Sequence, residues 1–229
     1  MCSKTRFHGP VLPIKFSLQK LGSFAFRKFL KSYLKISYHI ISYHRMIILT
    51  SNLEKIREIK EINPTLKIEI GPDLEEVLAD KDTVIIYKSL AAGEGYVVED
   101  TILEIDGKEI VDIKWKLKSL KEGMKLKWII SFGYHTGTHI KVYRGEVDGI
   151  ITIPTIFPEN AFGFDLYFKP LGMNKTLYEL QKEGLKNQFS PRALAIKALL
   201  LDTPIIIKDI NTIKQWTGNY QNENSIEYN

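Results

Sequence analysis

This sequence of 229 residues is poor in cysteine, and it contains no long apolar run and no internal repeat. The only cysteine is Cys2, so an intrachain disulfide is excluded, and a reducing compartment, the cytoplasm, is expected. No apolar run approaches the roughly 18–20 residues that a membrane span requires, which predicts a soluble protein without a membrane partner. The hydrophobic fraction of 44% is sufficient for one core, so the chain suits one domain or one domain with an appendage.

Acidic residues are absent from residues 1–45, which hold nine Lys or Arg residues and therefore carry a charge of +9. The rest of the chain carries −4, so the net charge of +5 and the pI near 9.0 describe mainly this basic, aromatic extension. Three interpretations of the extension stay open: a translation start at Met46, an arm that binds nucleic acid or a membrane surface, and an organelle transit peptide. We predict a domain over residues 46–216 and a polar, disordered tail over residues 217–229.

Both apolar strand patterns and helical patterns occur along residues 46–216. Residues 46–51 are typical of a buried first strand, and Asn52 is a plausible N-cap for a helix over residues 53–61. Asp106 and Gly107 predict a hairpin turn. The other expected strands are residues 66–70, 95–105, 126–131, 139–143 and 149–153, and the other expected helices are residues 74–90 (capped by Asp73), 176–186 and 191–201.

A strand-to-helix junction carries Ser51, Asn52 and Lys55. The first amides of a helix and its dipole favour an anion, and Lys55 adds a full positive charge one turn further on. These residues therefore predict a phosphate site, with a capped surface helix as the alternative.

Two adjacent carboxylates, Glu99 and Asp100, end an apolar strand pattern. Buried acids require a partner or a metal ion, so the pair is a candidate catalytic or metal-binding site. A solvent-exposed strand end is the other interpretation of the same residues.

Residues 162–195 combine an aromatic pair around a glycine, an aspartate, a Lys-Asn pair and Ser-Pro-Arg in one short stretch. This stretch resembles the C-terminal signature of the inosine/xanthosine triphosphate pyrophosphatase family. The residues that fall on the signature in register are Phe162, Gly163, Asp165, Phe168, Pro170, Gly172, Lys175, Thr176, Glu179, Lys186, Asn187, Ser190, Arg192 and Ala195. The resemblance covers about residues 46–201, since the Lys55 junction and the acid pair also match the family's motifs.

The resemblance implies an elongated, two-lobed α/β fold with a long twisted mixed sheet flanked by helices and a nucleotide cleft between the lobes, in a homodimer. It implies Mg²⁺-dependent hydrolysis of non-standard purine nucleoside triphosphates such as ITP, XTP and dITP to the monophosphate and pyrophosphate. Glu69 and Asp100 would hold the metal, with Asp100 as the base and Lys55 also catalytic. Phosphates would be bound by Ser51, Asn52, Lys55, Lys81, Lys114 and Lys186, and the base by Phe162, Phe164, Asp165, Ser190 and Arg192. For each lysine a solvated surface role is the alternative, and for the aromatic residues a core role.

Pro191 stands where the family has a histidine that reads the purine, and proline offers no donor. Ile102 replaces a glycine after the acid pair, and residues 107–112 replace a Gly-rich loop. These departures leave the choice among purines open. A second hypothesis follows from them: a non-catalytic nucleotide-binding protein, or a nucleic-acid-binding protein that uses residues 1–45.

Overall fold

The computed structural model describes residues 46–110, 119–159, 161 and 163–221, which lie in a compact unit spanning residues 43–229. Within these described ranges, no helix is both long and apolar enough to cross a membrane. The strands are β1 (Ile47–Leu49), β2 (Lys67–Glu69), β3 (Tyr96–Ile105), β4 (Lys108–Ile110), β5 (Lys125–His135), β6 (His139–Ile151), β7 (Phe168–Pro170) and β8 (Ile206–Asp209). The helices are α2 (Leu53–Ile62), α3 (Lys81–Ala92), α5 (Leu177–Lys182) and α6 (Pro191–Leu200), with 3₁₀ turns η2 (Lys186–Gln188) and η3 (Ile210–Thr212).

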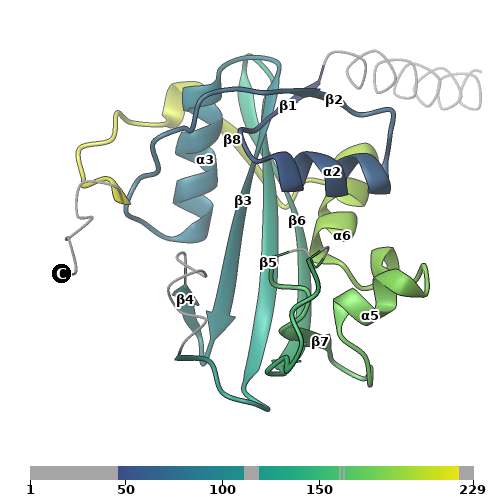
Figure 1. Cartoon of the computed structure of the whole chain (residues 1–229). Helices are drawn as coiled ribbons and strands as arrows, with labels where there is room; N and C mark the ends of the chain where they lie inside the picture. The colour runs from purple at the N-terminus through teal and green to yellow at the C-terminus, as the bar shows by residue number, and fades with distance from the viewer. Residues whose placement is uncertain (1–45, 111–118, 160, 162, 222–229) are drawn as a thin grey trace, which may run out of the picture. The chain divides into compact units, whose positions relative to one another are not determined.

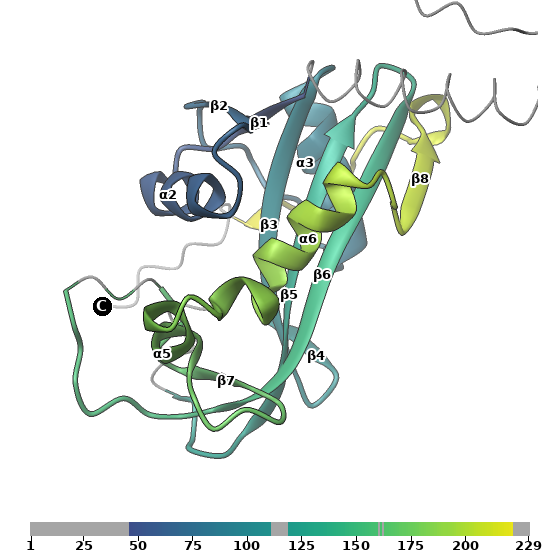
Figure 2. The same ribbon diagram turned by 90° about the vertical axis from the view of Figure 1, so that its right-hand side faces the viewer.

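The eight strands form one mixed sheet in the order β2-β1-β3-β5-β6-β7, with β4 paired to β3 and β8 paired to β6. β1 runs parallel to β2 and β3, and the remaining pairs are antiparallel. The long strands β3, β5 and β6 form the centre, with α3 on one face and α2 and α6 on the other (Figure 1). Figure 2 shows α6 lying across β5 and β6. The expected mixed sheet flanked by helices is confirmed.

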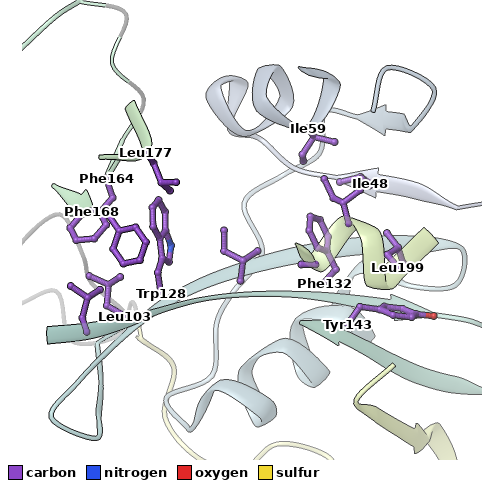
Figure 3. Close-up of a cluster of buried hydrophobic side chains, with 14 of the residues drawn as sticks. Ile48, Ile59, Leu103, Trp128, Phe132, Tyr143, Phe164, Phe168, Leu177 and Leu199 are labelled. Carbon is purple, nitrogen blue, oxygen red and sulfur yellow. The ribbon is translucent and has the colours of Figure 1, made fainter. Parts of the chain in front are cut away.

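The main core lies between the sheet and the helices α2, α5 and α6. Figure 3 shows Phe164 and Phe168 packed around Trp128, and their ring centroids each lie 5.3 Å from that of Trp128. Further along the same face, Ile59 of α2 and Leu199 of α6 are buried. Because burying one such side chain contributes about 1.5–3 kcal/mol, this core fixes α2 and α6 against the sheet.

Several local predictions are confirmed. Asn52 caps α2, and α6 begins with a proline in its first turn. Asp106 and Gly107 connect β3 to β4 with φ of 50° and 72°, as a tight hairpin turn requires. The strand expected over residues 66–70 is shorter, since β2 spans Lys67–Glu69, and Ile70 just after it is 68% exposed.

The two strands expected over residues 139–143 and 149–153 belong to one strand, β6. Its glycines are sites of close approach and do not mark turns. A Cβ at Gly145 would lie 2.0 Å from the carbonyl oxygen of Pro191, and a Cβ at Gly149 would lie 2.4 Å from the Phe168 ring. Glycine in a strand interior often marks such an approach, and here it admits α6 and β7.

The helix expected over residues 74–90 was predicted with the wrong start. α3 begins at Lys81, and the Asp80 side chain caps it by accepting from the amides of Asp82 and Thr83. The preceding residues are not helical because their backbone pairs with a distant segment: Val77 forms a bridge with Tyr220. Residues 217–221, which we assigned to the polar tail, therefore take part in the fold, and residues 222–229 lie outside the described ranges.

Candidate functional site

The edge of β3 that faces β1 is only partly covered. β1 pairs with the beginning of β3, at Tyr96 and Val97, and β4 pairs with its end. Within the part of the chain that the structure describes, residues 98–102 have a strand partner only on the side of β5. Glu99 and Asp100 lie in this stretch, where Glu99 is buried and Asp100 is partly exposed.

Glu99 and Asp100 point to opposite faces of the sheet, because successive side chains of a strand alternate. Glu99 contacts Arg192 of α6 and lies 3.2 Å from the Nζ of Lys55 on α2. Asp100 Oδ1 lies 4.0 Å from the Nζ of Lys88 on α3. The acid pair therefore belongs to two clusters, one on each face.

The face with α2 and α6 carries the first cluster, which we call the inner ion cluster. Its members are Lys55, Glu58, Glu99, Asp165, Lys186 and Arg192. Arg192 donates from Nε and Nη2 to Glu99 at 2.9 and 2.8 Å, and from Nη1 to Glu58. Lys186 Nζ lies 2.6 Å from Asp165 Oδ2 and 2.9 Å from Glu58 Oε1. Three carboxylates thus meet three cations, which offsets the cost of burying them.

The charged states of this cluster are strongly fixed. Burial alone would raise the pKa of Glu99, but the charges of Arg192 and Lys55 outweigh it and hold the pKa well below its usual range. Desolvation alone would lower the pKa of Arg192, but the carboxylates of Glu99 and Glu58 raise it. Both side chains therefore remain ionised at neutral pH.

The beginning of α2 places two members of the cluster. The side chain of Asn52 accepts from the amides of Glu54 and Lys55 at 3.0 and 3.1 Å and so starts the helix. Lys55 and Glu58 are three residues apart, which puts both on the face of α2 that meets the sheet. Ser51, also predicted as a site residue, is exposed at the turn before the helix.

The beginning of α6 places Arg192. Ser190 is buried, and its Oγ accepts from the amide of Ala193 at 3.3 Å, so its hydroxyl acts as a helix cap. Pro191 follows as the first helical residue, where its missing N–H costs nothing. Arg192 is then held in the first turn and reaches both carboxylates of the cluster.

Asp165 is the member of the cluster with an unused hydrogen-bonding atom. It is fully buried, and its Oδ1 has no hydrogen-bond partner within the described ranges. Burial raises the pKa of Asp165 to about 6, with the Lys186 charge opposing the shift and Glu58 adding to it. A hollow of about 290 Å³ next to the cluster is lined by Glu58, Glu61, Gln181, Gly184, Lys186 and Asn187. A buried carboxylate oxygen without a donor can accept an N–H group from a ligand.

Replacing Asp165 by Asn should change how stability depends on pH. The pKa of Asp165 is raised from 3.8 to about 6, so its stabilising contribution is full below pH 3.8 and is lost as the pH rises through about 6. We expect the free energy of unfolding of Asp165→Asn, relative to wild type, to rise by an amount on the order of 3 kcal/mol across this window. Urea denaturation at several pH values measures the difference, and a difference that is flat with pH would contradict the prediction.

The face with α3 carries the second cluster, formed by Glu76, Lys88 and Asp100, which we call the Asp100 cluster. Lys88 forms an ion pair with Glu76 and lies 4.0 Å from Asp100. Burial raises the pKa of Asp100; Lys88 opposes this shift, Glu76 adds to it, and Lys55 also opposes it. A carboxylate with a raised pKa is better suited to accept a proton near neutral pH.

A second cation is held near Asp100 on the same face. Ser131 of β5 pairs directly with Asp100, and the Nε of Arg144 on β6 donates to the Ser131 hydroxyl at 2.8 Å. Arg144 also forms an ion pair with Asp82 of α3. Lys88 and Arg144 thus place two positive charges around the carboxylate, which suits a polyanionic ligand.

Two residues that we expected in the site lie elsewhere. Glu69 is exposed and accepts a hydrogen bond from the Tyr96 hydroxyl at 3.2 Å. The strand register and ordinary strand spacing place its Cα about 12 Å from that of Asp100. Lys81 forms an ion pair with Glu109 of β4.

Glu76 and Lys88 lie beside Asp100, where Glu69 was expected as a metal ligand and Lys81 was expected to bind phosphate nearby. Twelve residues separate Glu69 from Lys81, and twelve also separate Glu76 from Lys88. The spacing alone therefore fits both pairs. The sequence analysis also missed Glu58, which joins Lys186 to Arg192, because its position in the helix pattern is ordinary.

Of the aromatic pair, only Phe164 is described. It is 5% exposed and packs against Trp128 and, in a stacked arrangement, against Tyr167. This packing gives Phe164 a core role, so we leave it out of the base site. Phe162 and Lys114 lie outside the described residues.

The Asp100 cluster fits a magnesium ion only together with a phosphate ligand. Within the described ranges, no group of three His, Cys, Asp or Glu side chains could hold a metal. Asp100 and Glu76 supply two carboxylates close to one lysine. Mg²⁺ is commonly bound by one or two carboxylates, and substrate phosphates and water complete its shell.

The family model and the relatives of known name agree on one family. The model of the Ham1 family matches residues 107–201. An inosine triphosphate pyrophosphatase from Scheffersomyces stipitis is 33% identical over 147 residues, which cover 56% of this chain and 74% of that protein. One from Puccinia graminis f. sp. tritici is 30% identical over 184 residues, covering 68% and 94%. The solved Ham1 protein of Staphylococcus aureus has a TM-score of 0.49 and 24% identity, covering 68% of this chain and 97% of that one.

Proposed function

Since the chain belongs to the Ham1 family, we propose that it hydrolyses non-standard purine nucleoside triphosphates, ITP, XTP and dITP, to the monophosphate and pyrophosphate. The observation that carries the proposal is the acid pair at the open edge of β3. One carboxylate anchors the inner ion cluster, and the other lies in the Asp100 cluster. The names of the relatives, inosine triphosphate pyrophosphatase and dITP/XTP pyrophosphatase, support the substrate class. We extend the proposal to a homodimer, as the resemblance implies, and to the cytoplasm, as the single cysteine predicts.

The inner ion cluster would bind the purine. The free Oδ1 of Asp165 accepts an N–H of the base, and Lys186 holds the other oxygen in place. Arg192 reaches the same region through Glu58 and keeps the cluster neutral overall. Ser190 supports this arrangement as the cap of α6, and Phe162 is our candidate for stacking on the base.

The triphosphate would lie along the open edge, where cations from both faces converge. Lys55 comes from one face and Lys88 from the other, and the dipole of α2, after Ser51 and Asn52, favours the same anion. We assign to Lys88 the phosphate-binding role that the sequence predicted for Lys81. Lys114 remains a candidate phosphate ligand.

Asp100 would take the proton of the attacking water. The water oxygen bonds to the α-phosphorus as the bond to the bridging oxygen of the β-phosphate breaks, and the water proton passes to Asp100. Lys55 and Lys88 stabilise the charge of the leaving pyrophosphate. Asp100 and Glu76 would hold Mg²⁺, with Glu76 in place of Glu69, and the ion would neutralise phosphate charge.

Discrimination among purines should be weak, because Pro191 is buried as the first residue of α6 and presents no donor to the base. A pyrophosphate-release assay with Mg²⁺ and inosine, xanthosine, guanosine and adenosine triphosphates tests the proposal. We expect turnover of inosine and xanthosine triphosphates. The rate with guanosine triphosphate should be closer to those two rates than it would be in a site that discriminates among purines. No pyrophosphate from any of the four would overturn the proposed function.

Glu76→Gln and Glu69→Gln form a matched pair that tests which of the two carboxylates binds Mg²⁺. We expect Glu76→Gln to lower kcat by about 10- to 100-fold and to raise the Mg²⁺ concentration required, because it removes a charged ligand beside Asp100. Glu69→Gln should stay close to wild type, since the Glu69 side chain is exposed and accepts a hydrogen bond from the Tyr96 hydroxyl. Steady-state rates over a Mg²⁺ titration measure both. The reverse order of effects would restore Glu69 as the ligand.

A further inference from the structure

The stretch that matches the family model ends at residue 201, and the described chain continues for twenty more residues. Its first part forms β8, which pairs with β6 at the far side of the sheet from β1. Its last part, residues 214–221, returns to α3 and to the segment before it. We call residues 214–221 the C-terminal strap. In Figure 1 this yellow segment runs down beside α3.

The strap is fixed to α3 through aromatic side chains. The Trp216 ring packs edge-on against Tyr87, with ring centroids 5.3 Å apart. The Tyr87 hydroxyl donates to the carbonyl oxygen of Lys214 at 2.7 Å. Trp216 Nε1 in turn donates to the carbonyl oxygen of Asn219 at 3.1 Å, which shapes the strap into a turn. Lys88, the lysine of the Asp100 cluster, directly follows Tyr87 on the same helix.

The end of the strap pairs with the backbone of residues 76–78. The amide of Leu78 donates to Asn219 O at 2.8 Å, and the amide of Gln221 donates to Glu76 O at 2.8 Å. The side-chain amide of Gln221 also donates to the carbonyl oxygen of Val77 at 3.1 Å. Val77 is buried beneath this pairing. The short segment that carries Glu76 is thus held by the strap and not by a helix or strand of its own.

We propose that the C-terminal strap is a positioning element that holds Glu76 against Lys88 and that the Asp100 cluster is incomplete without it. The inference rests on the proposed function for its activity readout. Main-chain hydrogen bonds at Glu76 and Leu78 fix the backbone position of Glu76. The ion pair with Lys88 fixes the position of the Glu76 carboxylate. Without the strap, Glu76 would sample many positions, and its carboxylate would no longer be placed near Asp100.

A truncation after Ile213 and the point variant Trp216→Ala test the strap, the second being the milder change. We expect the truncation to lower kcat by about 10- to 100-fold and to raise the Mg²⁺ requirement, while KM for inosine triphosphate stays within about threefold. KM should hold because the inner ion cluster lies on the other face of the sheet. Lys214→Ala is the matched control: the strap uses only the carbonyl oxygen of Lys214, so its rate should equal wild type.

A double-mutant comparison shows whether the strap acts through Glu76. In a Glu76→Gln background we expect the truncation to cost less than about threefold, since the residue that it positions is already lost. Equal losses in the two backgrounds would overturn the proposal, because the strap would then act only on general stability. Trp216→Phe keeps a ring against Tyr87 and should recover much of the rate lost in Trp216→Ala.

Amide hydrogen exchange tests whether the strap holds residues 76–78, and it requires no substrate. Amide exchange of the peptide around residues 76–78 should be faster in the truncation and in Trp216→Ala, because the Leu78 amide loses its acceptor. Unchanged exchange would overturn the strap proposal even if the enzyme is active. Absence of turnover in the wild-type chain would instead overturn the proposed function, and faster exchange would then still support the strap as the support of this segment.

Discussion

Asp100→Asn should abolish turnover of inosine triphosphate, with kcat reduced by at least about a thousandfold, while nucleotide affinity stays within about threefold. Asparagine has nearly the same shape as aspartate, but it cannot take up the proton of the attacking water, and it is a weaker metal ligand. Binding should survive because the inner ion cluster and Lys55 are unchanged. Pyrophosphate release measures the rate, and calorimetry with the same nucleotide measures affinity in the inactive variant.

Asp148→Asn is the matched control for this substitution. Asp148 lies on β6 of the same sheet and is exposed, so the loss of its charge should leave the rate unchanged. Asp100→Glu keeps a carboxylate but moves it by one methylene, and we expect a partial rate between the other two. A wild-type rate in Asp100→Asn would show that Asp100 is not the base.

Arg192→Met should destabilise the fold by about 3–5 kcal/mol, because it leaves two buried carboxylates with fewer positive charges. Arg192 is 3% exposed and bonds both Glu99 and Glu58. Urea denaturation at neutral pH measures the change in the free energy of unfolding. Arg57→Met is the matched control on α2: Arg57 is exposed, so its loss should cost less than about 0.5 kcal/mol.

A second variant distinguishes loss of charge balance from loss of packing as the cause of the lower stability of Arg192→Met. A Glu99→Gln change in the Arg192→Met background removes one uncompensated charge, so we expect it to recover part of the stability. The double variant could instead be less stable than Arg192→Met. The stabilising role of Arg192 would then not come from balancing the charges of the inner ion cluster. A loss below about 1 kcal/mol in Arg192→Met alone would contradict the prediction directly.

The motifs of the inner ion cluster could be found in the sequence because each follows a strong local signal. Asn52 and Ser190 are N-caps, and caps fix the first turn of a helix wherever the helix lies. Lys55 and Arg192 were therefore placed correctly at the beginning of α2 and α6. What could not be read was Glu58, the common partner of Lys186 and Arg192, since nothing in the sequence near Glu58 marks it as buried.

The Asp100 cluster was only half predictable. The strand around Asp100 is strongly apolar, so its existence and alternation were clear. The start of α3 was not, because residues 76–78 form hydrogen bonds with residues 219–221, far away in the chain. Lys81 is the first residue of α3 and pairs with Glu109, whereas Lys88, two turns further along the helix, lies beside Asp100.

The sequence by itself determined the family signature, the Asn52 cap and the acid pair in an apolar strand, because these depend on a few neighbouring residues. The tertiary structure alone decided which distant side chains join them. Glu58 reaches Arg192 only once α2 and α6 pack on one face of the sheet, and Glu76 reaches Lys88 only where the strap holds it. The physical reason is that ion pairs between segments far apart in the chain depend on the path of the backbone between them, and no local pattern encodes that path.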